Sequence, residues 1–155
     1  MKALLQTVGL AAMLAFTTVA VAANPVVGTW QLNLAKSKFS PGPAPKTDTR
    51  TYTESTDGIT MTWKSVAADG KETIVRSTFK TDGKDYPVTG SANFDTLTLK
   101  QVDSHTVHST QKKGGKVVGE TKRTVSKDGK ELTLASKGTA TDGVAYDTVM
   151  VYDRK

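Results

Sequence analysis

Short runs of alternating apolar and polar residues, separated by tight-turn signals, make up most of the chain. In one run, Ile59, Met61 and Trp63 fall on one face of an extended segment and the residues between them on the other. Asp-Gly pairs, whose glycines accept the positive φ of tight turns, recur between such runs, at residues 57–58, 69–70, 82–83, 128–129 and 142–143. This rhythm predicts antiparallel strands joined by hairpins.

The predicted fold class is all-β, with about ten strands and no large helix, since no helical period persists over ten or more residues. The sequence is expected to form an up-and-down meander that closes as a barrel or as a flattened sandwich; we favour the barrel because closure removes exposed edges. Alternating prolines make residues 35–46 an extended loop, and Pro87 marks an edge or a bulge. The strands are predicted at residues 26–34, 47–55, 59–67, 72–81, 84–89, 96–101, 105–112, 116–126, 131–140 and 144–152.

The first 22 residues have a different pattern. Lys2 precedes a long apolar run, and Ala20-Val21-Ala22 has the small-x-small form of a signal-peptidase site. We expect residues 1–22 to be a signal peptide, cleaved after Ala22 or Ala23, with residues 23–155 forming one domain that has no stable membrane insertion. An uncleaved membrane anchor is the alternative interpretation of so long an apolar run.

Composition narrows the setting and the partners. Cysteine is absent, which excludes disulfides and a lipid anchor on cysteine, and no N-x-Ser/Thr sequon is present. These two absences favour a bacterial periplasm or exterior, so we expect a secreted or periplasmic protein. The net charge of +6 suits acidic partners. We expect no nucleic-acid partner, however, because no dense basic stripe with interleaved aromatic residues is present.

No motif indicates catalysis or metal binding. His105 and His108 are the only histidines, and residues three apart on a strand point to opposite faces, so the pair cannot chelate one metal there. The chain contains no G-x-S-x-G, phosphate-loop or H-E-x-x-H motif. We therefore expect no catalytic residues, no metal, no cofactor and no enzymatic activity.

Gly28-Thr29-Trp30, at the start of the first predicted strand, matches the G-x-W signature of lipocalins and related calycins. The whole mature chain resembles small bacterial secreted proteins described as lipocalin-like, with residues 28–42 carrying most of the similarity. Its mature length and strand count are similar to those of fatty-acid-binding proteins. The resemblance implies a calycin-type barrel that carries a small apolar ligand. In lipocalins an arginine often packs across this tryptophan, a role open here to Arg154 or Arg123.

Two features depart from the fatty-acid-binding proteins that the chain resembles. Residues 35–46 are too short and too rich in proline for the two-helix lid of that family. Its Arg-x-Tyr pair, which binds a carboxylate from the final strand, is incomplete: Tyr152 matches the tyrosine, but Met150 occupies the arginine position. The carboxylate clamp therefore cannot be transferred to this chain.

Side chains that the strand pattern turns inward are the candidates for lining a binding cavity. Trp30 is expected to close one end of the barrel, with Gly28 in a structural role, whereas Trp63 is equally consistent with a cavity wall and a solid core. Arg123 shares a face with Thr121 and Val125 and is the better inward arginine; Arg76 lies on a face that looks solvated. The predicted ligand-binding residues are Trp63, Met61, Phe79, Arg123 and Tyr146.

The function that this pattern favours is the binding of a small apolar or amphipathic molecule inside the barrel of a monomeric protein. The alternative is a non-enzymatic structural or envelope-interaction barrel with a filled core. These two hypotheses differ in whether the interior holds a cavity.

Overall fold

The structure is a computed structural model that describes residues 24–155; the predicted signal peptide at residues 1–22 lies outside them. The described residues form ten strands and one short 3-10 helix, η1. In chain order these are β1 (Gly28–Leu32), η1 (Leu34–Lys36), β2 (Thr47–Ser55), β3 (Gly58–Val66), β4 (Glu72–Phe79), β5 (Asp82–Pro87), β6 (Thr96–Gln101), β7 (Thr106–Lys113), β8 (Lys116–Val125), β9 (Glu131–Thr139) and β10 (Ala145–Arg154).

All ten predicted strands are present, which confirms the all-β prediction. The ranges 47–55 and 96–101 coincide with β2 and β6, and the other strands begin and end within two residues of the predicted positions. Alternation and turn chemistry sufficed here because most strands are joined by hairpins, and the long connection of residues 33–46 is marked by its alternating prolines.

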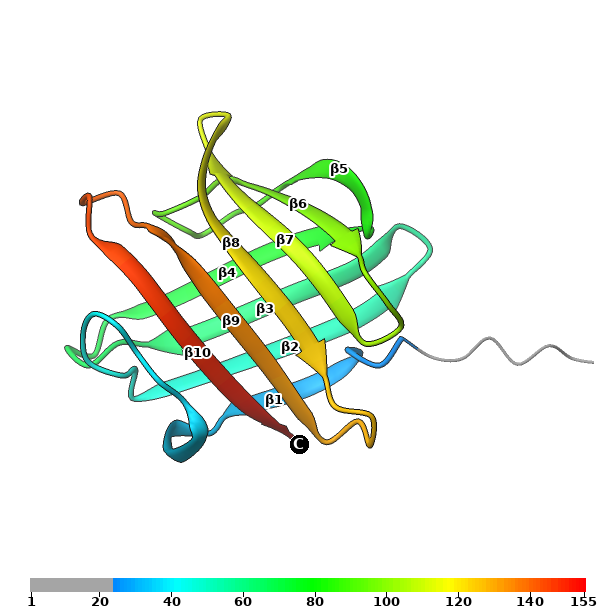
Figure 1. Cartoon of the computed structure of the whole chain (residues 1–155), viewed down its shortest axis with the longest axis horizontal. Coiled ribbons are helices and arrows are strands. Elements are labelled where there is room, and N and C mark those ends of the chain that lie inside the picture. Colours follow the sequence, from blue (N-terminus) through cyan, green and yellow to red (C-terminus); the bar gives the residue numbers. More distant parts are fainter. Residues whose placement is uncertain (1–23) are drawn as a thin grey trace, which may run out of the picture.

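The strands form one antiparallel sheet in the order β4-β3-β2-β1-β10-β9-β8-β7-β6-β5. Every neighbouring pair is consecutive in sequence except β1 and β10, which join the two halves of the meander. Figure 1 shows the sheet curled so that β6–β10 cross in front of β1–β4. The closure is thus a flattened barrel, and its interior lies between these two layers.

The barrel is nearly closed, with a gap in the ladder between β4 and β5. A single bridge joins the two edges, where the Arg76 and Thr89 backbones exchange hydrogen bonds of 3.0 and 2.9 Å. Pro87 lies at the end of β5, an edge strand, as its missing N–H requires. The Arg76 side chain is exposed, in agreement with its predicted outward face.

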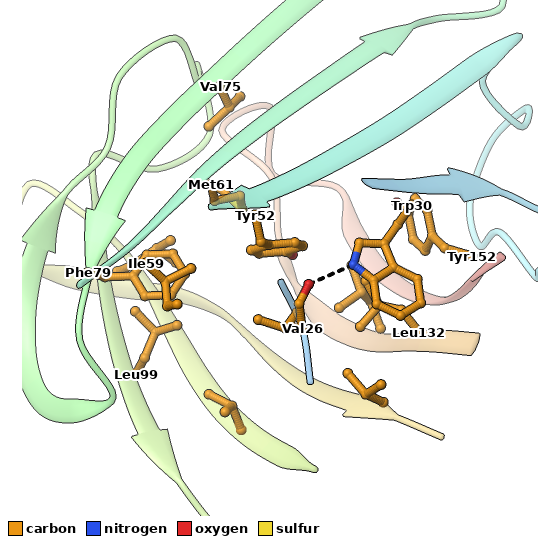
Figure 2. Close-up of a cluster of buried hydrophobic side chains, with 14 of the residues drawn as sticks. Val26, Trp30, Tyr52, Ile59, Met61, Val75, Phe79, Leu99, Leu132 and Tyr152 are labelled. Atoms are coloured by element: carbon orange, nitrogen blue, oxygen red, sulfur yellow. Dashed lines mark hydrogen bonds between the residues drawn. The ribbon is translucent and has the colours of Figure 1, made fainter. Parts of the chain in front are cut away.

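The base of the barrel is packed around Trp30, which is fully buried. The indole Nε1 donates to the Val26 carbonyl over 2.8 Å (Figure 2). The Arg154 guanidinium stacks on the ring at 4.1 Å from its centroid and donates to the carbonyls of Pro25, Val27 and Gly129. Trp30 and Arg154 therefore pack together at this end of the barrel, and the arginine that lies across the indole is Arg154.

The proline-rich connection after η1 runs beside β10. Lys38 pairs with Val149, and the Asp147 amide donates to the Ser40 carbonyl over 2.8 Å. Phe39 packs against the hydrophobic core. These contacts extend the ladder of β1 along β10, so the segment adds to the barrel wall.

Candidate functional site

The barrel encloses a cavity of about 260 Å³ between its two layers. That volume would hold about nine water molecules at roughly 30 Å³ each. Both layers and the loop before β6 contribute to its wall, and the predicted residues Trp63, Met61, Phe79, Arg123 and Tyr146 all belong to it. The other lining residues are Arg50, Tyr52, Asn93, Phe94, Leu97, Leu99, Val107, Ser109, Gln111, Thr121, Leu134, Ser136, Thr148 and Met150.

Strand register arranges the β7–β10 wall of the cavity in rows, because residues paired across neighbouring strands lie side by side on one face. The row nearest the base is mostly apolar but contains an arginine, the next carries hydroxyls, and the row nearest the mouth contains two glycines. From base to mouth the rows are Val107–Arg123–Leu134–Met150, Ser109–Thr121–Ser136–Thr148 and Gln111–Gly119–Gly138–Tyr146.

The hydroxyl row is held together by its own hydrogen bonds. The Thr121 hydroxyl accepts from Gln111 Nε2 over 2.7 Å and lies 2.8 Å from the Ser136 hydroxyl. The Ser109 hydroxyl donates to the Thr121 carbonyl over 3.3 Å. The row thus forms a polar strip across an otherwise apolar wall.

The opposite wall carries a buried charge network around Asp48. The Asp48 carboxylate accepts from Trp63 Nε1 over 2.6 Å and from the Tyr152 hydroxyl over 2.9 Å. That hydroxyl accepts in turn from Arg50 Nε over 3.0 Å, and the Arg50 guanidinium stacks 4.6 Å from the centroid of the Trp63 ring. Asp48 therefore compensates Arg50 directly and through Tyr152.

The network shifts the pKa values of its members. Burial disfavours the charge on Arg50, but Tyr152, Tyr52 and Asp48 outweigh it and raise the pKa of that guanidinium. Burial also raises the pKa of the Tyr152 hydroxyl, and Asp48 adds to the rise while Arg50 opposes it. Arg50 is consequently charged and Tyr152 neutral near neutral pH.

Arg123 has no such compensation. Its side chain is 7% exposed, and its guanidinium lies 5.3 Å from the Tyr52 ring centroid and 5.9 Å from that of Phe79. Burial lowers its pKa, Tyr52 opposes the shift, and the neighbouring charge of Arg50 reinforces it. Within residues 24–155, no carboxylate forms an ion pair with Arg123.

The buried charges therefore do not balance. The charged side chains buried among the described residues are Asp48, Arg50 and Arg123, two cations and one anion. An arginine remains protonated even when buried, because its reference pKa is far above neutrality. The interior thus has an excess of one positive charge, placed on the cavity wall.

Near the mouth, Gln111 leaves one polar atom without a partner. Its side chain is 8% exposed, and Oε1 is the one buried side-chain polar atom in the described part of the chain that lacks a hydrogen bond. Beside it, Gly119 and Gly138 make room for the Tyr146 hydroxyl, since a Cβ on either glycine would collide with it. The mouth therefore presents an acceptor and a hydroxyl over bare backbone.

The loop before β6 reaches across the mouth toward the β9–β10 turn. Asn93 Oδ1 accepts from the Thr141 hydroxyl over 3.1 Å and from its amide over 3.4 Å. Asn93 and Phe94 both line the cavity, and Phe94 packs against the core. This loop thus partly covers the cavity, and no residue of 35–46 lines it.

Sequence reasoning missed Arg50 and Gln111, although each shares an inward face with an aromatic or apolar residue of its strand. Arg50 alternates with threonines on β2, in the same phase as Tyr52, and Gln111 is in phase with Val107 on β7. A charged or amide side chain among threonines resembles a solvated face, so the phase of one aromatic or apolar neighbour was the available signal.

The described residues contain no cluster of three or more His, Asp or Glu side chains able to hold a metal ion. His105 and His108 lie outside the cavity lining. Nor is any helix within 24–155 sufficiently long and apolar for a membrane span.

The sequence matches no protein-family model and no curated protein. The structure, however, is similar to the crystal structure of zebrafish ileal bile acid-binding protein complexed with cholic acid, with a TM-score of 0.50 and 11% sequence identity. The match covers 84% of this chain and 99% of that chain. The fold is a ten-stranded, calycin-type barrel like that of the fatty-acid-binding proteins.

Proposed function

We propose that this protein binds a small amphipathic anion inside its barrel. The observation that carries the proposal is Arg123, a buried guanidinium on the cavity wall for which the protein supplies no carboxylate. Leaving a buried charge uncompensated is costly, and a carboxylate or similar anion would remove that cost through paired, charge-assisted hydrogen bonds.

The remainder of the wall supports an apolar body for the ligand. Met61, Phe79, Leu99, Leu134 and Met150 all face the cavity, and binding sites typically combine such walls with a few polar groups. The zebrafish protein of similar fold was crystallised with cholic acid, which is itself an acid. The Arg-x-Tyr clamp is incomplete in this chain, and we assign the role of anion partner to Arg123.

The cavity supports the binding proposal over the alternative of a barrel with a filled core. We further propose that the protein acts as a monomer outside the cytoplasm, in the periplasm or exterior, as a carrier without catalytic activity. Support for this setting comes from the small-x-small segment Ala20-Val21-Ala22 behind an apolar run.

Calorimetric titration with decanoate tests the binding proposal. We expect Arg123→Met to weaken decanoate binding about 10- to 100-fold, since hydrogen bonds to charged groups contribute about 1.5–3 kcal/mol. Arg76→Met is the matched control, because Arg76 is exposed on the outer face of β4, and its affinity should remain that of the unaltered protein.

Equal affinity of the Arg123→Met and Arg76→Met variants would overturn the assignment of Arg123, and absence of binding by the unaltered protein would overturn decanoate-like anions as ligands. Native beside denaturing mass spectrometry of protein purified from its own compartment then provides an independent test. Extra mass seen only in the native spectrum would identify a non-covalent passenger, and the bare native mass would report the oligomeric state.

A further inference from the structure

We infer that the ligand carries a hydrogen-bond donor at the end remote from its anionic group, and that Gln111 Oε1 accepts from it. This inference rests on the proposed function, since it assigns the second polar contact of the same ligand. It specifies the class as an acid whose apolar body ends in a hydroxyl or amide group.

Only one of the two polar atoms of the Gln111 side-chain amide has a hydrogen-bond partner. Nε2 donates to the Thr121 hydroxyl over 2.7 Å, and that hydroxyl is fixed in turn by Ser136. These contacts leave the buried Oε1 with no partner, on a side chain that lines the cavity and is 8% exposed. An unpaired buried acceptor is unfavourable, so a ligand that donates to it would be favoured over one that does not.

Two glycines, which have no side chains, lie beside this acceptor. Gly119 pairs directly with Gln111 across the β7–β8 ladder, and Gly138 pairs with Gly119. A Cβ on Gly119 would crowd both Gln111 Oε1 and the Tyr146 hydroxyl. The two glycines therefore let the Tyr146 hydroxyl lie close to the unpaired Oε1, so a small polar end group of a ligand would meet both at this end of the cavity.

The register sets the length of the ligand. Arg123 lies four residues along β8 from Gly119, the partner of Gln111, which corresponds to about 13 Å at roughly 3.3 Å per residue. An extended chain gains about 1.1–1.2 Å per bond, so about ten bonds cover most of this separation. A medium-chain acid hydroxylated at its far end, such as 10-hydroxydecanoate, has these dimensions.

The test compares 10-hydroxydecanoate with 10-methoxydecanoate, which keeps the oxygen but cannot donate. For the unaltered protein we expect the hydroxy acid to bind roughly three- to tenfold more tightly, as one net hydrogen bond predicts. Gln111→Met keeps the length of the side chain and removes the acceptor, so it should abolish the preference. Gln101→Met, the same change outside the cavity lining, should retain it.

Equal binding of the two acids by the unaltered protein, or an undiminished preference in Gln111→Met, would overturn the inference. Tighter binding of the methoxy acid would overturn it as well, by showing that apolar contacts hold this end of the ligand. The Arg123→Met titration distinguishes failure of this inference from failure of the proposed function. Loss of affinity there for both acids supports anion binding whatever the outcome at Gln111, whereas failure of both acids to bind the unaltered protein would contradict the proposed function itself.

Discussion

The base of the barrel and its cavity both place a guanidinium against an aromatic ring, with opposite outcomes. At the base, Arg154 stacks on Trp30 and donates to three backbone carbonyls. In the cavity, Arg123 lies against Tyr52 and Phe79 and meets no carboxylate among residues 24–155. The same pair of chemical groups thus stabilises the fold at one end and leaves an unmet charge in the middle.

The two regions contribute differently to the stability of the folded state. Packing at the base is complete, because Trp30, Leu132 and Tyr152 are each 0% exposed and the indole N–H is bonded. The cavity lacks both close packing and charge balance, as expected of the proposed ligand-binding site. Loss of a large side chain should therefore cost more stability at the base than at the cavity, whereas removal of the unpaired charge of Arg123 should increase stability.

The largest expected effect is at the base. Trp30→Ala should lower the free energy of unfolding by about 3–5 kcal/mol, because it removes a fully buried indole and leaves a void. Trp63→Ala is the matched change at the cavity and should cost roughly half as much, since Trp63 already borders empty space. Urea unfolding of both variants measures the difference. A larger loss of unfolding free energy for Trp63→Ala would contradict the expectation that the base is the more tightly packed region.

The next effect has the opposite sign. Arg123→Met should raise the free energy of unfolding of the ligand-free protein by about 1–4 kcal/mol, because an unpaired buried charge is replaced by an apolar side chain of similar length. When both proteins are measured in saturating decanoate, the variant should no longer be the more stable of the two, because decanoate then compensates the charge of Arg123 in the unaltered protein. Arg76→Met, on the exposed face, should leave the stability within about 0.5 kcal/mol. Destabilisation of the ligand-free protein by Arg123→Met would contradict the account of that charge.

The smallest effect concerns Tyr152, which belongs to both regions: its ring packs in the base (Figure 2), and its hydroxyl donates to Asp48. Burial raises its pKa above the ordinary 10.0, so the unfolded chain ionises first as the pH rises. A raised folded pKa means that this contribution is complete below about pH 10 and declines above it.

Melting temperatures measured from pH 8 to pH 11 check this sign. Tyr152→Phe should start from a lower value, since Asp48 and Arg50 lose a partner, and should then fall less steeply above pH 10. Parallel curves for the two proteins would assign the alkaline loss to other groups, among them Tyr146, whose pKa burial also raises.

Local pattern was enough to predict the strands, since Ile59, Met61 and Trp63 alternate with polar residues and each Asp-Gly pair reverses the chain. The same phase argument placed Arg123 inward and Arg76 outward, and the structure has both so. The other predicted ligand-binding residues, Trp63, Met61, Phe79 and Tyr146, line the cavity.

Contacts between distant strands were not accessible in this way. The stacking of Arg154 on Trp30 depends on the pairing of β1 with β10, and the Asp48–Tyr152 bond joins residues 104 positions apart. Sequence phase could place Tyr152 but could not supply Asp48 and Arg50 as its partners. The unpaired atom of Gln111 depends on the rotamers of several side chains, which no linear pattern encodes.

The single non-consecutive pairing in the sheet also has a consequence for how the chain folds. Within β1–β4 and within β5–β10, each strand pairs with its neighbours in sequence. Each group can therefore form by adding strands to local hairpins, which close quickly. The β1–β10 ladder instead joins residues separated by most of the domain, and the entropy of closing so long a loop is lost before its contacts form. We expect two meanders to form early and their docking along β1 and β10, with Trp30 at the joint, to limit the folding rate. During synthesis on the ribosome, the barrel can close only after β10 has emerged.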